Sequence, residues 1–378
     1  MQCFVHLCKD MKLRYWIMIA WVTVLQAECI AAGFGDLPAD IRVQAQERID
    51  EGFHLGTVIG VIDNSGRRFY GFGQTSMSDG SLPDRHSIFE IASITKSFTA
   101  ILVAELEIDS RVSTTAPIGR YVPALRRADT DAAQYITLER LLTHTAGLPR
   151  NPTNTDDNDD DRYKNYSTED LETFLESWTI YPATPSYSYS NAGLMVVEHA
   201  IENEIGRTYE ELMVEQVLDK LGMHDTFFAV PKEKRDRLVT GFRNGVSTTE
   251  MDVGQYPAMG GLRSTADDML TYLGAHIGLV PNPLCSAIDN TLVERFSDGE
   301  ITLSLGWRIS RNEVSGKTIY HFTGGSTGFV SFAAFDPVNQ KAVVVLVNGT
   351  RWFSDLGFKV LDPTYPLKDP GPRADESN

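Results

Sequence analysis

Cysteine is scarce in this chain, and its placement excludes an internal disulfide. Of the four cysteines, Cys3, Cys8 and Cys29 lie within the first thirty residues, so only Cys285 remains in the rest of the chain. A single cysteine cannot form an internal disulfide in the mature protein. No histidine flanks Cys285, which argues against a thiol nucleophile. We therefore predict that Cys285 is a semi-buried small hydrophobic residue.

Positive charge is also in short supply. The formal net charge is −17, and no basic stripe offsets it. A nucleic-acid backbone is repelled by such a chain, so we expect no nucleic-acid partner. Residues 151–161 gather several aspartates, but their spacing fits no calcium-binding loop. We predict a solvated surface loop there and no metal site.

Long apolar runs are absent. The one candidate, residues 16–25, is shorter than the roughly 20 residues that a membrane span needs. It follows a basic segment, 9–14, and precedes small residues at 30–33, which is the pattern of a secretory signal peptide. We predict a leader over residues 1–32, a secreted or periplasmic protein, and no stable membrane span after leader removal. A lipid anchor at Cys29 is the alternative.

Strand patterns lie near both ends of the chain, and helix patterns lie between them. Two hairpins are predicted, each from two apolar runs around a turn, over residues 55–62 with 67–72 and 328–335 with 341–348. Helical spacing marks the starting segment 40–51 and the middle segments 137–143, 168–178, 191–205 and 208–221. Ser167-Thr-Glu-Asp170 predicts a capping box, and Gly206 and Gly222 fall at helix ends. The fold class is therefore α/β plus α, with an antiparallel sheet formed by both chain ends, flanked by helices, and an inserted, mostly helical domain. We expect an α/β domain over 33–125 and 255–378 and a helical domain over 126–254.

A serine and a lysine three residues apart form the sharpest local pattern. Ser93 follows a short strand pattern and precedes a buried helix pattern, so it stands at a helix N-terminus, where developing negative charge is favoured. Lys96 returns to the same helix face and can reach the serine oxygen. A serine hydroxyl needs an adjacent base, and a lysine of lowered pKa can serve. Alone, the pair also fits a serine cap with a solvent-facing lysine.

Two further motifs accompany this pair. Tyr189-Ser-Asn191 precedes a helix; Tyr189 can shuttle a proton, and Asn191 can hold Lys96 or a substrate carbonyl. Residues 321–329 are rich in glycine and lead into a strand, so a substrate can lie close to that backbone. The amides of Ser93 and Gly325 would form a two-donor oxyanion hole, each donor being worth about 10²–10³ in rate.

The three motifs together resemble the serine β-lactamase and penicillin-binding family, and most closely the class C β-lactamases and related D-alanyl-D-alanine carboxypeptidases and endopeptidases. The resemblance covers the whole mature chain and includes the spacer segments 141–149, 221–226, 260–265 and 305–307. It implies an acyl-enzyme on Ser93, no metal and no cofactor, and a small-molecule or peptidoglycan-derived substrate. It also implies these site residues: catalytic Ser93, Lys96 and Tyr189, and substrate-binding Asn191, Thr323, Gly324 and Gly325.

The third motif departs from the family pattern. Thr323-Gly324 usually follows a lysine or a histidine in the family, but here Phe322 stands in that place and His321 is displaced by one residue. Because adjacent side chains of a strand face opposite ways, we expect His321 to point away from the site. The cation that would bind a substrate carboxylate is then missing, which favours esters or amides that lack this group.

Three functions remain open from the sequence. The first is a β-lactamase or peptidoglycan peptidase that works through an acyl-enzyme on Ser93. The second is an esterase or D-amino-acid amidase or peptidase on the same fold, and the third is a non-catalytic penicillin-binding or sensor protein.

Two other patterns are not assigned a catalytic role. Gly324-x-Ser326-x-Gly328 matches the nucleophile elbow of another hydrolase fold, but a strand follows it where that elbow needs a helix. His144 ends a helical segment and is predicted to be structural.

Overall fold

The computed structural model describes residues 37–78, 80–128, 134–155, 162–178, 186–351 and 353–368. Tertiary contacts separate a short N-terminal unit, Met1–Ala39, from a large unit, Asp40–Asn378. The predicted leader and the aspartates of residues 156–161 lie outside the described residues. Within the described part of the chain, no helix is both long enough and apolar enough to span a bilayer.

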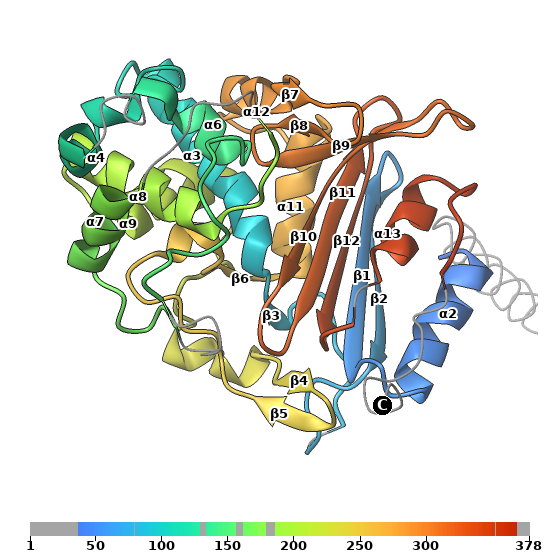
Figure 1. Ribbon diagram of the computed structural model, residues 1–378. Helices are drawn as coiled ribbons and strands as arrows, with labels where there is room; N and C mark the ends of the chain where they lie inside the picture. The colour runs from blue at the N-terminus through green and yellow to red at the C-terminus, as the bar shows by residue number, and fades with distance from the viewer. Residues whose placement is uncertain are drawn as a thin grey trace, which may run out of the picture. The chain divides into compact units, whose positions relative to one another are not determined.

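An antiparallel sheet of eight strands takes its strands from both ends of the large unit (Figure 1). The strand order is β2-β1-β12-β11-β10-β9-β8-β7. The bounds are β1 Gly56–Asp63, β2 Gly66–Gly73, β7 Phe296–Ser297, β8 Thr302–Ser304, β9 Trp307–Arg311, β10 Thr318–Gly325, β11 Val330–Asp336 and β12 Lys341–Asn348. Both predicted hairpins are present, and the pairing of β1 with β12 joins the two chain ends. The predicted fold class is confirmed.

Helices cover both faces of this sheet (Figure 1). α11 (Ala266–His276) packs against β1 and β12 on one face, and α13 (Ser354–Leu361) packs against β11 and β12 on the other. α2 (Ala39–Asp50) lies beside α13, and the buried Arg48 and Asp355 join the two helices at 2.7 Å. The central strands are therefore buried on both sides, which is why their sequences are continuous apolar runs.

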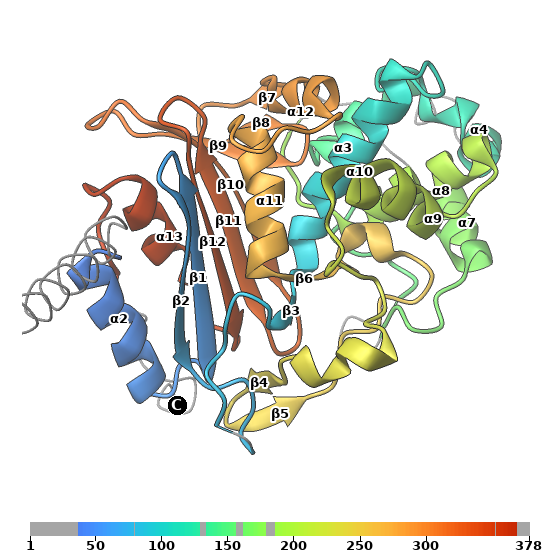
Figure 2. The same cartoon turned by 180° about the vertical axis from the view of Figure 1, so that it is seen from behind.

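The remaining helices of the described residues gather beside the sheet, where α12 contacts both α3 and α11 (Figure 2). They are α3 Thr95–Ile108, α4 Pro123–Ala128, α6 Leu138–Leu142, α7 Thr168–Ser177, α8 Asn191–Ile205, α9 Tyr209–Met213, α10 Asp219–Leu221 and α12 Cys285–Leu292. A π-helical turn, Val214–Leu218, joins α9 to α10, and 3-10 turns occur at Ala92–Ile94, Ile118–Arg120, Lys232–Arg237 and Pro257–Met259. The division into two domains remains a prediction.

Local signals placed the helix ends correctly. Ser167 and Asp170 form the predicted capping box of α7. Gly206 and Gly222 end their helices in the left-handed conformation, with φ of 72° and 69°. The prediction for Cys285 was wrong: it is exposed, because it is the first residue of α12 and the buried face of that helix is formed by other residues.

A small two-stranded sheet leads the chain into the site. β3 (Ile88–Glu90) pairs with β6 (Arg263–Thr265), and a separate hairpin pairs β4 (Gly241–Arg243) with β5 (Val246–Thr248).

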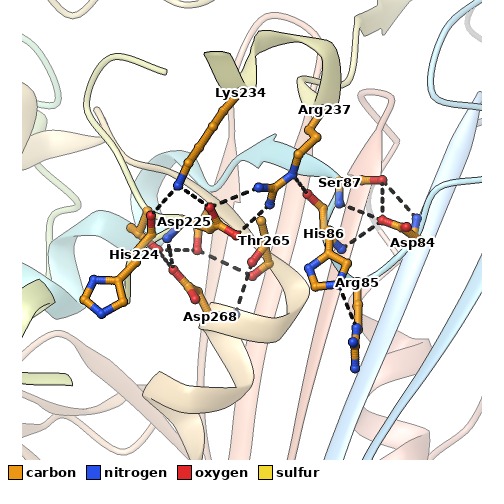
Figure 3. Close-up of polar contacts among 12 residues, drawn as sticks. Asp84, Arg85, His86, Ser87, His224, Asp225, Lys234, Arg237, Thr265 and Asp268 are labelled. Carbon is orange, nitrogen blue, oxygen red and sulfur yellow. Dashed lines mark hydrogen bonds and ion pairs between the residues drawn. The ribbon is translucent and has the colours of Figure 1, made fainter. Parts of the chain in front are cut away.

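A polar network contacts the start of β3 and the end of β6 (Figure 3). Asp225 accepts hydrogen bonds from Arg237 and Lys234, each at 2.7 Å, and its own amide donates to Asp268, near the start of α11. Arg237 also donates to the carbonyl of His86, just before β3. The hydrogen bond from Arg237, together with the one from Lys234 and the charges of both, lowers the pKa of Asp225 to about 2. The network therefore fixes the strand that precedes Ser93.

Candidate active site

Ser93 lies in the 3-10 turn that joins β3 to α3. The preceding residue, Ala92, has a φ of 45°, a left-handed conformation that costs a non-glycine residue about 1–2 kcal/mol. The turn is held by the amide of Ile91, which donates to the carbonyl of Leu262 at 3.1 Å. Ser93 is therefore presented on a sharply turned backbone at the entry to a buried helix, as predicted.

Lys96 lies one helical turn further on and points back to the serine. Its Nζ is 3.1 Å from Ser93 Oγ and also donates to the carbonyl of Met259. The side chain is only 2 % exposed. Burial lowers the pKa of Lys96 well below its usual range, and the charge of Arg150 lowers it further. The buried amine is therefore driven toward the neutral form, which can accept a proton from Ser93.

Tyr189 approaches the same oxygen from the loop before α8. Its hydroxyl lies 2.7 Å from Ser93 Oγ. Burial raises the pKa of Tyr189, while the hydrogen bond to Ser93 and the charges of Arg150 and Arg308 oppose that shift. The phenol is therefore protonated at neutral pH, and Lys96 is the better proton acceptor of the pair in the resting site. The structure thus brings Ser93, Lys96 and Tyr189 together as the motifs predict.

His144 supports the Tyr189 loop. Its ring centroid is 4.6 Å from that of Tyr189, and its Nδ1 accepts a hydrogen bond from the amide of Ser190 at 3.1 Å. Burial, together with the charges of Lys96 and Arg308, lowers the pKa of His144 to about 3. The imidazole is therefore neutral and engaged by the backbone, which fits the structural role predicted for it.

Asn191 begins α8, next to the capping residue Ser190, whose Oγ accepts from the amide of Gly193 at 2.8 Å. The Asn191 side-chain amide donates to Oδ1 of Asn151 at 3.2 Å. Of the two partners expected for Asn191, the structure does not bring it to Lys96, whose amine is directed to other acceptors. A contact with a substrate carbonyl stays a prediction.

The third motif ends β10 and lies against the segment that leads to Ser93. Pairing of β10 with β9 stops at His321, so the last four residues of β10 extend beyond β9. A Cβ on Gly324 would lie 2.2 Å from the carbonyl oxygen of Ile91, so only glycine fits. Ser331, opposite Gly324, donates to the same carbonyl at 2.8 Å. Gly325 follows and is exposed.

The side chains of β10 alternate between the two faces of the sheet. His321 lies on the α13 side, with its ring centroid 4.8 Å from that of Phe358, and burial lowers its pKa to about 3. Phe322 faces the other way and is 6 % exposed in the core. The prediction that His321 points away is confirmed. Thr323 shares the His321 face and lines a small hollow with Phe353 near α13, so only its backbone is available to a substrate at Ser93.

Two arginines near Tyr189 were missed by the sequence analysis. The guanidinium of Arg308, on β9, donates to the hydroxyl of Tyr187 and lies 5.1 Å from the centroid of that ring. The guanidinium of Arg150 lies 5.0 Å from the ring centroid of Tyr189. No local motif marks either residue, because each reaches the site through tertiary contacts.

Comparison with known proteins identifies the family. The family model described as beta-lactamase matches residues 44–358. A beta-lactamase of Lysobacter lactamgenus is 25% identical over 328 residues, covering 78% of this chain and 82% of that protein. The D-alanyl-D-alanine-carboxypeptidase/endopeptidase AmpH of Escherichia coli K12 is 27% identical over 319 residues, covering 78% of this chain and 79% of that protein.

Solved structures show the same fold. A class C beta-lactamase from Rhodobacter sphaeroides superposes with a TM-score of 0.73 at 26% identity, covering 82% of this chain and 95% of that one. A beta-lactamase/D-alanine carboxypeptidase from Pseudomonas syringae gives a TM-score of 0.76 at 22% identity, covering 87% and 99%. The chain belongs to the beta-lactamase family, and it is a serine hydrolase.

Proposed function

We propose that this enzyme acylates Ser93 with β-lactams or D-alanyl peptides and then hydrolyses the acyl-enzyme. The observation that carries the proposal is the approach of Lys96 Nζ and the Tyr189 hydroxyl to one oxygen, Ser93 Oγ, at 3.1 and 2.7 Å. The substrate class follows from the relatives, whose names describe β-lactamases and a D-alanyl-D-alanine carboxypeptidase.

The first step is acylation. Ser93 Oγ attacks the substrate carbonyl and passes its proton to the Lys96–Tyr189 pair, because burial lowers the pKa of the lysine amine and so favours its neutral form. The oxyanion that forms is held by the backbone amides of Ser93 and Gly325. Collapse of the tetrahedral intermediate breaks the carbon–nitrogen bond, and the leaving nitrogen takes the proton from the same pair. Asn191 and the backbone of Thr323 and Gly324 bind the substrate beside the reacting carbonyl.

Deacylation reverses these roles. The Lys96–Tyr189 pair takes a proton from water, which attacks the ester carbonyl, and Ser93 leaves with that proton restored. The two groups act as a coupled pair, so a pH–rate profile reports apparent pKa values that belong to the pair.

A second function, hydrolysis of esters or amides without a carboxylate, is favoured by one observation. The residue before Thr323-Gly324 is Phe322, an apolar side chain packed in the core. Among the described residues, the charges that lower the pKa of Tyr189 are those of Arg150 and Arg308. Substrates that carry a carboxylate would depend on these two arginines, whereas a neutral ester would not.

Intact-protein mass spectrometry after incubation with a penicillin tests the acyl-enzyme on wild type and on Ser93→Ala. We expect an added penicilloyl mass, or penicillin consumption, in wild type alone. A lasting adduct indicates slow deacylation, and consumption without an adduct indicates a working β-lactamase. If wild type neither binds nor consumes penicillin but hydrolyses p-nitrophenyl acetate through Ser93, the second function replaces the first. Activity that survives in Ser93→Ala refutes both.

We also propose a secreted or periplasmic location, supported by the basic and apolar pattern of residues 9–25. The test is the N-terminus of the protein recovered from the periplasm of an expressing bacterium. A mature chain that starts close to residue 33 supports the proposal, and an uncleaved chain in the cytoplasm contradicts it.

A further inference from the structure

Glu198 is a carboxyl group buried in the interior, on α8 two turns beyond Asn191. The residue is 1 % exposed. Burial raises its pKa well above the usual range, and the neighbouring Glu202 and Glu210 raise it further. No ion pair involves Glu198 within the described residues, and an uncompensated buried charge is costly. The surroundings of Glu198 therefore favour its neutral form.

The carboxyl holds the turn that presents a carbonyl to Lys96. Glu198 Oε2 accepts a hydrogen bond from the amide of Ala258 at 2.8 Å. Ala258 is the middle residue of the 3-10 turn Pro257–Met259, and the next carbonyl, that of Met259, accepts from Lys96 Nζ. Glu198 therefore connects α8 to the lysine through one turn of backbone.

Helix α3 also contacts this turn, through the side chain of Thr99. Thr99 Oγ1 lies 3.1 Å from the carbonyl oxygen of Ala258 and 2.8 Å from the hydroxyl of Tyr209. Thr99 is three residues beyond Lys96, so the two side chains lie on one helix face. Two side chains thus hold Ala258, a carboxyl on α8 and a hydroxyl on α3, one residue before the carbonyl that contacts the catalytic amine.

We propose that Glu198 is a positioning residue that, as a neutral carboxyl, holds the Met259 carbonyl against the Lys96 amine. The proposal rests on the acyl-enzyme function proposed above. A neutral amine that donates one hydrogen to Met259 has its lone pair free to accept the proton of Ser93, 3.1 Å away. An ionised carboxylate in the place of Glu198 would instead favour the ammonium form of Lys96 and oppose its action as a base.

Several titratable groups lie around Lys96 and Glu198. Around Lys96 they are Tyr189, His144 and Arg150, and around Glu198 they are Glu202, Glu210, Tyr209 and Tyr256. The tyrosines have raised pKa values, that of His144 is about 3, and burial raises the pKa values of Glu198, Glu202 and Glu210. A change in the pH profile is therefore assigned to the Lys96–Tyr189 pair through the titration of Lys96 itself, followed by NMR.

Two substitutions of Glu198 distinguish the effect of its acceptor oxygen from the effect of its charge. Glu198→Gln keeps an oxygen for the Ala258 amide and cannot ionise, whereas Glu198→Met keeps the volume and removes the acceptor. The matched control is Glu202→Met, one turn further along α8, because Glu202 accepts from the amide of Tyr209 and not from the Pro257–Met259 turn. The readout is the rate at which a fluorophosphonate labels Ser93 between pH 5 and pH 9.

We expect Glu198→Gln to keep the wild-type rate within about twofold and the same pH profile. Glu198→Met should label at least tenfold more slowly, with a displaced profile, because a catalytic group misplaced by about 1 Å can cost 10²-fold. Glu202→Met should behave as wild type. Wild-type behaviour of a folded Glu198→Met overturns the proposal. A tenfold loss of the labelling rate in Glu198→Gln also overturns the proposal, because it means that the ionised carboxylate is required. This outcome tests the proposal even if Glu198→Met does not fold.

A second readout does not depend on reactivity. The Lys96 titration, followed by NMR on protein labelled with ¹⁵N-lysine and assigned with Lys96→Arg, should shift in Glu198→Met and not in Glu198→Gln. If wild-type Ser93 is not labelled while the Lys96 titration behaves in this way, the acyl-enzyme proposal fails and the positioning role of Glu198 stands. If Ser93 is labelled and the Lys96 titration is the same in all variants, the role of Glu198 fails and the acyl-enzyme proposal stands.

Discussion

Replacement of Gly324 by alanine tests whether the close approach of β10 to the serine segment sets the site. The added Cβ would lie 2.2 Å from the carbonyl oxygen of Ile91 and 2.3 Å from Ser331 Oγ, whereas real Cβ contacts essentially never fall below 3.0 Å. Ile91 is two residues before Ser93, and its carbonyl belongs to the backbone, so no side-chain rotation can relieve the overlap. The two segments must separate by about 0.8 Å.

That separation acts on the proposed oxyanion hole, whose two amides, those of Ser93 and Gly325, belong to the two segments. A misplacement of about 1 Å can cost 10²-fold in rate, which corresponds to about 2.7 kcal/mol of transition-state stabilisation. We therefore expect kcat/KM for a chromogenic cephalosporin, and the rate of Ser93 labelling, to fall by about two orders of magnitude in Gly324→Ala.

The matched control is Gly193→Ala, in the first turn of α8. A Cβ there is no closer than 3.4 Å to its neighbours, and alanine in a helix is more stable than glycine by about 0.5–1 kcal/mol. Activity should be unchanged and the melting temperature equal or higher. If Gly324→Ala keeps its activity within about threefold and its melting temperature, then the contact with Ile91 does not position the catalytic groups, and the reasoning is refuted.

Three further predictions follow from contacts in and around the site. Tyr189→Phe removes the hydroxyl 2.7 Å from Ser93 Oγ and should slow acylation by about 10²–10⁴-fold; a smaller loss would leave Lys96 as the sole proton carrier. Arg308→Gln should raise KM for a penicillin and leave p-nitrophenyl acetate hydrolysis unchanged, and equal effects on both would place Arg308 away from the substrate carboxylate. Asp225→Asn should lower the melting temperature at pH 7. Because the folded-state pKa of Asp225 is about 2, below the unfolded value, this difference should shrink as the pH falls from 4 to 2, and a constant difference would contradict the assigned cause.

Local patterns predicted the elements that depend on local physics. The capping box at Ser167, the helix ends at Gly206 and Gly222, and the two hairpins all appear where their residues indicate. Ser93 and Lys96 were also predictable as neighbours, because three residues along a helix return to one face. Tyr189 joined them only through the resemblance of the three motifs to a known family, since nothing local brings a residue 96 positions away to the serine.

The rest of the site depends on long-range packing. The carbonyl of Met259 reaches Lys96 from a turn 163 residues away, and no spacing rule marks it. No motif or spacing rule marks Arg308 or Glu198 in the sequence either. The direction of the Thr323 side chain was predictable too, because the alternation that placed His321 away from the site applies to Thr323 as well: residues two apart on a strand share a face.

The pairing of β1 with β12 has a consequence for how the protein is made. The two strands are about 290 residues apart along the chain, yet they are neighbours in the sheet. A nascent chain that has not reached Lys341 has no partner for the inner edge of β1, and contacts at such sequence separation form slowly. Synthesis must therefore be nearly complete before the sheet closes.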